Sequence, residues 1–314
     1  MSTNTKINWP YLIAAYFCLF SFGLIENGKG PSYPEILVFF SINPIKGSLL
    51  FTLASVASLI TTLTASYWLA KFNTLRSLQY FCFIFFAGTF LMGFIPYFYQ
   101  SYLLFLCGVT ISGLAAGATG ICMNLMVPEA TPPNYRRRVF AGLHSCYGIA
   151  ACLAPLIINC LRKYNLSWQS YFILTSFLPL IVFVLGFKIK PIQYVQKSKI
   201  KDSFLFKKIQ IGLFISTYVA SEILLSSRMV YFLEKEWLFN KNDSALYLTF
   251  FFILLMIGRI IFGLFNLPGK NYSWLIISII LSLLFLTVGI NLHPLGLVFC
   301  GLTMSMFFPT SMDL

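Results

Sequence analysis

The stretch "SLQYFCFIFFAGTFLMGFIPYFYQSYLLFLCGVTISGLAAGATGICMNLMVP", residues 77–128, contains no charged residue. It is long enough for two membrane-crossing helices, because one crossing takes ~20 mostly apolar residues. The segment "IPYFYQSY" supplies a short turn between them. Strands of a membrane barrel would alternate apolar and polar residues at every second position, and these runs do not. The stretch therefore predicts an all-α integral membrane protein.

The composition of the whole chain supports the same class. Of 314 residues, 58% are hydrophobic and 10% are charged, whereas soluble domains carry about 25% charged residues. The net charge of +13 comes from Lys and Arg that concentrate in short loops, so we expect the lipid bilayer and no nucleic acid as the partner. The eight cysteines lie in apolar runs without a CxxC pair. We interpret them as small hydrophobic residues, and we predict no metal site and no cofactor.

Ten segments have the length and composition of membrane spans. They are 9–28, 46–70, 77–97, 101–127, 138–161, 167–187, 208–232, 243–266, 272–290 and 294–314. A cytoplasmic N-terminus places fourteen basic residues inside and six outside, Lys29 among the six, with Arg228 and Arg259 within spans. This bias predicts a multi-pass protein of the cell (inner) membrane with its N-terminus in the cytoplasm.

The chain also contains an internal repeat. At an offset of 196 residues, Ser48–Leu63 aligns with Ser244–Arg259, and Glu26 aligns with Glu222. At an offset of 193, "LCGVTIS" aligns with "FCGLTMS". The alignments predict two parallel six-helix repeats. We expect an N-terminal half at 1–187, a basic cytoplasmic linker at 188–207, and an incomplete four-helix second half at 208–314, with the last two helices missing.

Four stretches carry a resemblance to a known family. They are "FGLIENGKGPSYPEIL" (22–37), "ASYWLAKFNTLRS" (65–77), "VFAGLHSCYGIAACLAPLI" (139–157) and "YVASEILLSSRMVYFLEKEWLFNKNDSALYLTFFFILLMIGR" (218–259). The chain resembles the major facilitator superfamily, in the branch of the L-fucose and glucose/galactose permeases. The second stretch lacks the Gly and Asp usual at its position. The resemblance implies the major facilitator fold. It also implies secondary active transport of a small polar solute, expected to be a sugar, driven by a proton (or sodium), by alternating access in a monomer.

Glu26 is the proton-coupling candidate. An ionisable residue within a membrane span is a functional-site hypothesis by default, and the family's coupling acid on the first helix lies close to this position. In this branch the fourth helix can carry a second acid, and Ala116 stands at that position. The competing interpretation of Glu26 is a solvated acid at the outer interface.

The remaining candidates fall into two groups. The substrate-binding candidates are Glu222, Asn124, His144, Tyr147, Tyr218 and Trp68. The resemblance implies gating or structural roles for Arg259, Gly258, Lys71 and Arg76. Glu222 and Arg228 lie 120° apart on an unbroken helix. Therefore either the helix breaks at Ser226–Ser227 or each charge has a partner elsewhere, with Arg228 at the outer rim.

Other functions remain as alternatives. No HExxH, GxSxG or paired-Asp motif is present, so we predict that the protein is not an enzyme. The alternative to a transporter is a non-functional truncated fragment or a transporter-derived sensor.

Overall fold

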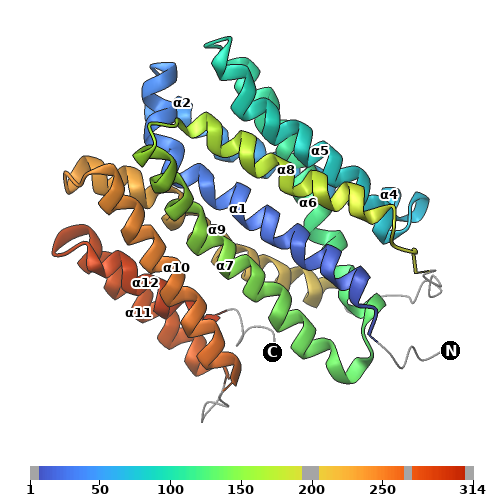
Figure 1. Ribbon diagram of the computed structural model, residues 1–314. Helices are drawn as coiled ribbons and strands as arrows, with labels where there is room; N and C mark the ends of the chain where they lie inside the picture. Colours follow the sequence, from blue (N-terminus) through green and yellow to red (C-terminus); the bar gives the residue numbers. More distant parts are fainter. Residues whose placement is uncertain (1–6, 193–204, 265–270, 308–314) are drawn as a thin grey trace. The chain divides into compact units, whose positions relative to one another are not determined.

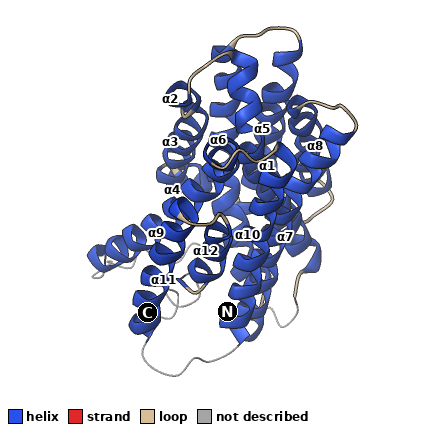
Figure 2. Ribbon diagram, turned by 90° about the vertical axis from the view of Figure 1, so that its left-hand side faces the viewer, coloured by secondary structure: helices blue, strands red, loops and turns tan. Residues whose placement is uncertain are grey.

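The computed structural model describes residues 7–192, 205–264 and 271–307 (Figure 1). Within these ranges every regular element is a helix, which confirms the all-α prediction (Figure 2). The predicted linker, 188–207, falls largely outside the described residues. The helices are α1 Trp9–Phe40, α2 Pro44–Gly47, α3 Leu49–Leu63, α4 Ala65–Lys71, α5 Thr74–Phe94, α6 Tyr102–Ala130, α7 Arg136–Lys163, α8 Trp168–Gly186, α9 Leu205–Glu236, α10 Lys241–Leu264, α11 Asn271–Asn291 and α12 Leu295–Ser305, with short 3₁₀ turns at Ile95–Tyr97 and Pro133–Tyr135.

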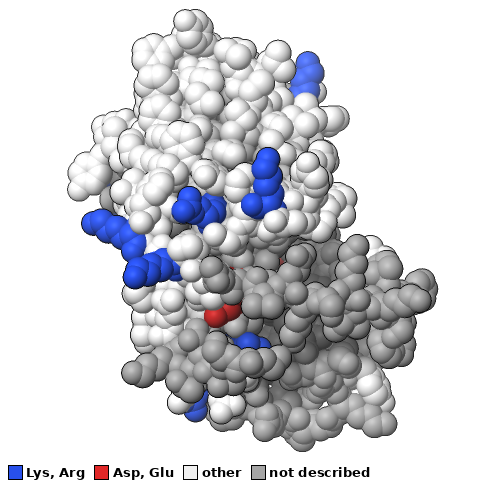
Figure 3. All heavy atoms as spheres, turned by 90° about the vertical axis from the view of Figure 1, so that its right-hand side faces the viewer, with Lys and Arg blue, Asp and Glu red and all other residues white. Residues whose placement is uncertain are grey.

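Most of these helices are long and apolar enough for a bilayer. Among the described residues, nine helical segments meet that criterion by length and composition, and α12 is a shorter apolar helix. The face in Figure 3 has broad areas without acidic or basic side chains. Such surface suits hydrocarbon, because charged side chains are costly within a bilayer.

The first helix is longer than the sequence predicted. The span expected at 9–28 runs as α1 to Phe40, through Pro31 and Pro34. Proline usually ends a helix because it has no N–H to donate. Here the helix continues, because its side chains beyond Pro31 are buried, among them Tyr33 before Pro34 and Ile36 after it. Lys29 was expected in an outer loop, and that expectation is wrong, since Lys29 lies inside α1 with 1% of its surface exposed.

The described helices group into two compact units. Unit 1 comprises Met1–Ala150 and Cys160–Val195, and unit 2 comprises Ala151–Asn159 and Gln196–Leu314. In unit 1, α8 packs against both α1 and α5 (Figure 1). The Tyr171 hydroxyl of α8 donates to the Leu24 carbonyl at 2.7 Å, and a Cβ at Gly28 would overlap the Tyr171 ring. The missing side chain at Gly28 therefore lets α8 approach α1.

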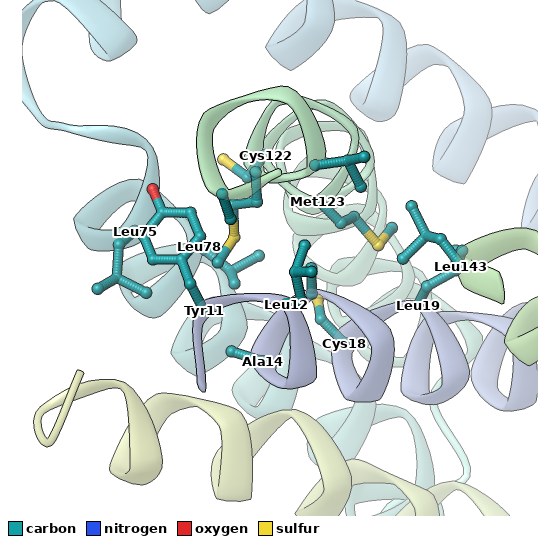
Figure 4. Packing of buried hydrophobic residues seen from close by; sticks show 14 of the residues in the cluster. Tyr11, Leu12, Ala14, Cys18, Leu19, Leu75, Leu78, Cys122, Met123 and Leu143 are labelled. Carbon is teal, nitrogen blue, oxygen red and sulfur yellow. The ribbon is translucent and has the colours of Figure 1, made fainter. Parts of the chain in front are cut away.

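A hydrophobic cluster fixes the first half of α1 within unit 1. Tyr11 and Cys18 pack with Leu78 of α5 and Cys122 of α6 (Figure 4). The sulfur atoms of Cys18 and Cys82 lie 3.6 Å apart. The cluster joins α1, α5 and α6 near the start of α1, so this half of the helix has little freedom to move.

Polar contacts reinforce the same end of α1. Both oxygens of the Glu129 carboxylate accept a hydrogen bond, one from the Tyr11 hydroxyl and one from the Thr74 hydroxyl, each at 2.6 Å. These three residues belong to α6, α1 and α5 respectively. The first turn of α1 is therefore held by hydrogen bonds as well as by apolar packing.

Unit 2 is assembled through small residues. A Cβ at Gly258 of α10 would overlap Ser305 of α12, and one at Gly301 of α12 would meet the backbone of Phe251. Such positions let membrane helices pack at short distance. One side of the unit remains open. A largely apolar groove of about 560 Å³ runs along α9, α11 and α12, with Leu224, Ile279 and Leu286 among its lining residues.

Candidate functional site

An ion pair lies in the middle of α1. The Lys29 Nζ is 2.6 Å from the Glu26 Oε1, three residues away on the same helix. The Lys29 side chain is 2% exposed and that of Glu26 is 26% exposed. Lys29 lies about 7 Å past the midpoint of Trp9–Phe40 at 1.5 Å per residue. Because an isolated charge is very costly in a low-dielectric interior, the contact lets each charge offset the other inside the helix bundle.

Aromatic side chains lie on α1 and α7 about one turn before this pair. The ring of Tyr147 on α7 lies 6.2 Å from that of Phe22, which is one turn before Glu26. Tyr147 also lies against Gly23. Tyr147 is thus a substrate-binding candidate that contacts α1 within about one turn of Glu26.

A second ion pair joins α1 to α7. The Arg162 Nε is 2.8 Å from the Glu35 Oε1, and its guanidinium also donates to the Pro31 carbonyl at 2.8 Å. Both side chains are mostly buried, at 12% and 15% exposed. The sequence did not single out Glu35 or Arg162, because the predicted spans leave both residues in loops. Extending α1 beyond Pro31 would have been the signal.

A third pair lies in unit 2, between α9 and α10. The Arg259 Nη2 is 2.6 Å from the Glu222 Oε2 and donates to the Tyr218 hydroxyl at 3.1 Å. The Tyr218 ring stacks on Phe307, with centroids 4.5 Å apart and planes at 4°. The structure therefore joins two substrate-binding candidates, Glu222 and Tyr218, to Arg259, for which the resemblance implies a gating or structural role.

The charge partners in α9 follow from its geometry. α9 continues without a break through Ser226 and Ser227, whose hydroxyls donate to carbonyls three residues back. Glu222 pairs across to Arg259. This agrees with the expectation that an unbroken helix gives Glu222 a partner other than Arg228.

Three further substrate-binding candidates lie in local contacts. Asn124 donates to the Gly120 carbonyl of its own helix at 2.8 Å. The Trp68 Nε1 donates to the Thr61 carbonyl at 3.1 Å. The His144 ring stacks near Phe140, with centroids 6.5 Å apart.

The remaining gating or structural candidates lie at helix ends or in packing. Lys71 ends α4, with its Nζ 5.6 Å from the Phe72 ring centroid. Arg76 is exposed, and its backbone N–H donates to Asn73 at 2.8 Å. Gly258 makes room for Ser305. Within the described ranges, no group of three or more His, Cys, Asp or Glu residues could hold a metal ion.

Comparison with known proteins identifies the family. A sequence model described as the Major Facilitator Superfamily matches residues 15–314. The chain belongs to the major facilitator superfamily. The resemblance seen in the sequence is thereby confirmed, and this superfamily member is a multi-pass protein of a transporter family. A search of curated proteins finds no match.

Solved structures show the same fold. A D-xylose–proton symporter superposes with a TM-score of 0.70 at 12% identity, over 97% of this chain and 81% of that one. The transporter FucP in an outward conformation gives 0.66 at 16%, over 96% and 84%. The xylose transporter XylE from E. coli, partially occluded and inward open, gives 0.75 at 12%, over 96% and 82%. The superfamily member therefore has the major facilitator fold.

Proposed function

We propose that this protein carries a small polar solute, a sugar, across the membrane by alternating access, together with a proton that Glu26 takes up. The observation that carries the proposal is the acid within the first membrane helix, 26% exposed and therefore reachable by a proton. The fold supports transport. Two of the similar structures are described as a D-xylose–proton symporter and a xylose transporter, which favours a sugar as the solute.

Coupling follows from the cost of charge in the membrane. A carboxylate is strongly disfavoured where water is excluded, whereas the protonated acid is tolerated. Alternating access interconverts an outward-facing and an inward-facing state. If water reaches Glu26 more easily in one of these states, protonation of Glu26 shifts the equilibrium between them toward the state in which Glu26 is less accessible. A solute that binds only one of the states then moves together with the proton.

Aromatic residues near the two repeat-related acids are the proposed solute contacts. Tyr147 lies near Glu26 along α1, and Tyr218 lies beside Glu222 in unit 2. A tyrosine offers an apolar face and a hydroxyl, and small-molecule sites combine apolar walls with a few polar groups in this way. We assign each unit one aromatic contact to the solute.

The orientation remains as proposed from the sequence. With Lys29 inside α1, the six basic residues counted outside become five, and the fourteen counted inside are unchanged. The bias of fourteen to five favours a cytoplasmic N-terminus. We propose the cell (inner) membrane as its location.

The test is uptake into vesicles that contain the purified 314-residue chain. Labelled hexoses and pentoses are supplied with an inward proton gradient, with a sodium gradient at constant pH, or with neither. We expect the proton gradient to raise accumulation at least tenfold. We expect Glu26→Gln to abolish that rise while solute exchange across the membrane continues. Glu236→Gln, at an exposed acid at the end of α9, is the matched control.

Each contrary result has its own meaning. Accumulation that ignores both pH and Glu26→Gln removes proton coupling. A response to sodium alone assigns a different coupling ion. No uptake of any sugar by correctly inserted protein removes the transport proposal and favours a transporter-derived sensor or a non-functional fragment.

A further inference from the structure

We propose that Lys29 is an internal counter-ion that competes with the coupling proton for Glu26. Glu26 stays ionised while the Lys29 ammonium touches it, and it takes up a proton only when α1 bends and the ammonium moves away. This inference rests on the proposed coupling role of Glu26, and it names the residue that sets the pH at which coupling occurs.

The geometry of the pair indicates that the Lys29 ammonium and the coupling proton compete for the Glu26 carboxylate. The Lys29 Nζ lies 2.6 Å from the Glu26 Oε1, within hydrogen-bond distance of one of the two carboxylate oxygens. Lys29 is 1% exposed, so its ammonium has almost no water to replace the carboxylate. Protonation of Glu26 with the pair closed would leave a buried, uncompensated ammonium, which is strongly unfavourable.

The helices packed around α1 supply no substitute for Lys29. Between Ser77 and Pro128, which covers nearly all of α5 and α6, there is no charged residue, and α8 has none. On α7, Arg162 is paired with Glu35, and the His144 ring lies against Phe140. The tyrosines that face this part of α1 are Tyr147 and Tyr171, and the Tyr171 hydroxyl donates to the Leu24 carbonyl. Within the described part of the chain, Lys29 is thus the basic side chain that contacts Glu26.

The backbone beside the pair is suited to bending. The sequence from Glu26 to Pro34 is "ENGKGPSYP", with two glycines and two prolines. Pro31 and Pro34 give no N–H to the carbonyls four residues before them, those of Asn27 and Gly30. Sharp helix kinks occur at such positions. The pair lies across the first part of this weakened backbone, so a bend there changes the distance between Glu26 and Lys29.

Arg162 holds the segment on the far side of the weak point. It contacts both the Pro31 carbonyl and Glu35, while the first half of α1 is fixed by the cluster around Tyr11 and Cys18. Because each end has its own anchor, relative motion of the two halves is concentrated between Glu26 and Pro31. That is where the ion pair lies.

The test compares the pH dependence of uptake in the wild-type chain and in Lys29→Met. An opposite charge nearby favours the ionised acid, so removing it lets Glu26 take up a proton at higher pH. We expect the pH of half-maximal uptake to rise by about one to three units, as is typical for loss of one adjacent opposite charge. Lys29→Arg, which keeps the charge, should leave the profile near that of the wild type. Lys46→Met, at an exposed lysine, is the matched control.

A second measurement tests the counter-ion role of Lys29 even if a variant does not transport. The infrared carbonyl band of a protonated carboxyl group is followed against pH in detergent-solubilised protein, and Glu26→Gln identifies the band of Glu26. We expect this band to appear at higher pH in Lys29→Met than in the wild type. Equal titration of the two proteins overturns the counter-ion proposal. If instead wild-type uptake fails while the band shifts, transport is wrong and the counter-ion role holds.

Discussion

The two acids related by the internal repeat are neutralised in different ways. Glu26 on α1 pairs with Lys29 of the same helix, whereas Glu222 on α9 pairs with Arg259 of α10, and both distances are 2.6 Å. A pair within one helix depends only on that helix's backbone. A pair between two helices also holds them together. The comparison indicates that the pair in unit 1 leaves α1 free to bend and that the pair in unit 2 stabilises the α9–α10 contact.

The largest expected effect comes from breaking the pair in unit 2. Arg259→Met leaves the buried Glu222 carboxylate without its cation, and loss of one partner of a buried pair costs about 3–5 kcal/mol. We expect a large fall in the unfolding temperature in detergent. The double variant Glu222→Gln/Arg259→Met removes both charges and should recover part of the loss. Equal unfolding temperatures for the single and double variants would show that the two side chains are not coupled.

A smaller effect on the free energy of unfolding is expected from substitutions at Gly28 and at its repeat-related position, Leu224, because one is packed against a neighbouring helix and the other is exposed. Gly28→Ala places a methyl group against the Tyr171 ring of α8, and overpacking of this kind costs about 1–3 kcal/mol. Leu224, at the repeat-related position of α9, is 66% exposed. Leu224→Ala should therefore change the free energy of unfolding by no more than about 0.5 kcal/mol. Thermal unfolding of both variants in one detergent makes the comparison, and similar losses would contradict it.

The two units also differ in how the face of α5 and its repeat-related counterpart are covered. In unit 1, aromatic side chains of α8 pack along α5. Phe83 of α5 lies against Phe183 of α8, and Phe86 and Phe90 lie against Phe177 of α8. The offset of 196 residues carries these three α5 positions to Ile279, Ser282 and Leu286, all of which line the groove of unit 2. The face of α5 that α8 covers therefore has its repeat-related counterpart in the wall of an apolar groove.

The smallest effect, measured as sugar uptake, is expected from a disulfide that cross-links the first half of α1 to α5. The sulfur atoms of Cys18 and Cys82 lie 3.6 Å apart, so copper phenanthroline should oxidise them to a disulfide between α1 and α5. If the Glu26–Lys29 pair opens by bending beyond residue 26, this cross-link should change sugar uptake by less than about twofold. Cys18→Ala treated in the same way is the control. Complete loss of uptake on cross-linking would show that α1 moves as a whole.

The sequence predicted the fold well, because long uncharged runs such as residues 77–128 have few structural solutions in a bilayer. It also predicted that Glu222 and Arg228 would not pair on an unbroken helix. It missed the ion pairs, because ending the first span at residue 28 assigned Lys29 and Glu35 to a loop. The partner of Glu222 lies 37 residues away on another helix. Tertiary packing selects such a partner, and periodicity within one helix does not reveal it.

Gly258 and Arg259 are neighbours in α10 that serve different helices. The first makes room for Ser305 of α12, and the second holds Glu222 of α9. In a genetic screen, substitutions at the two codons would give the same loss-of-function phenotype for unrelated reasons. Second-site suppression separates them, because Ser305→Gly relieves the crowding caused by Gly258→Ala and offers nothing to a chain that lacks the arginine. Adjacent positions in this helix therefore belong to different suppression groups.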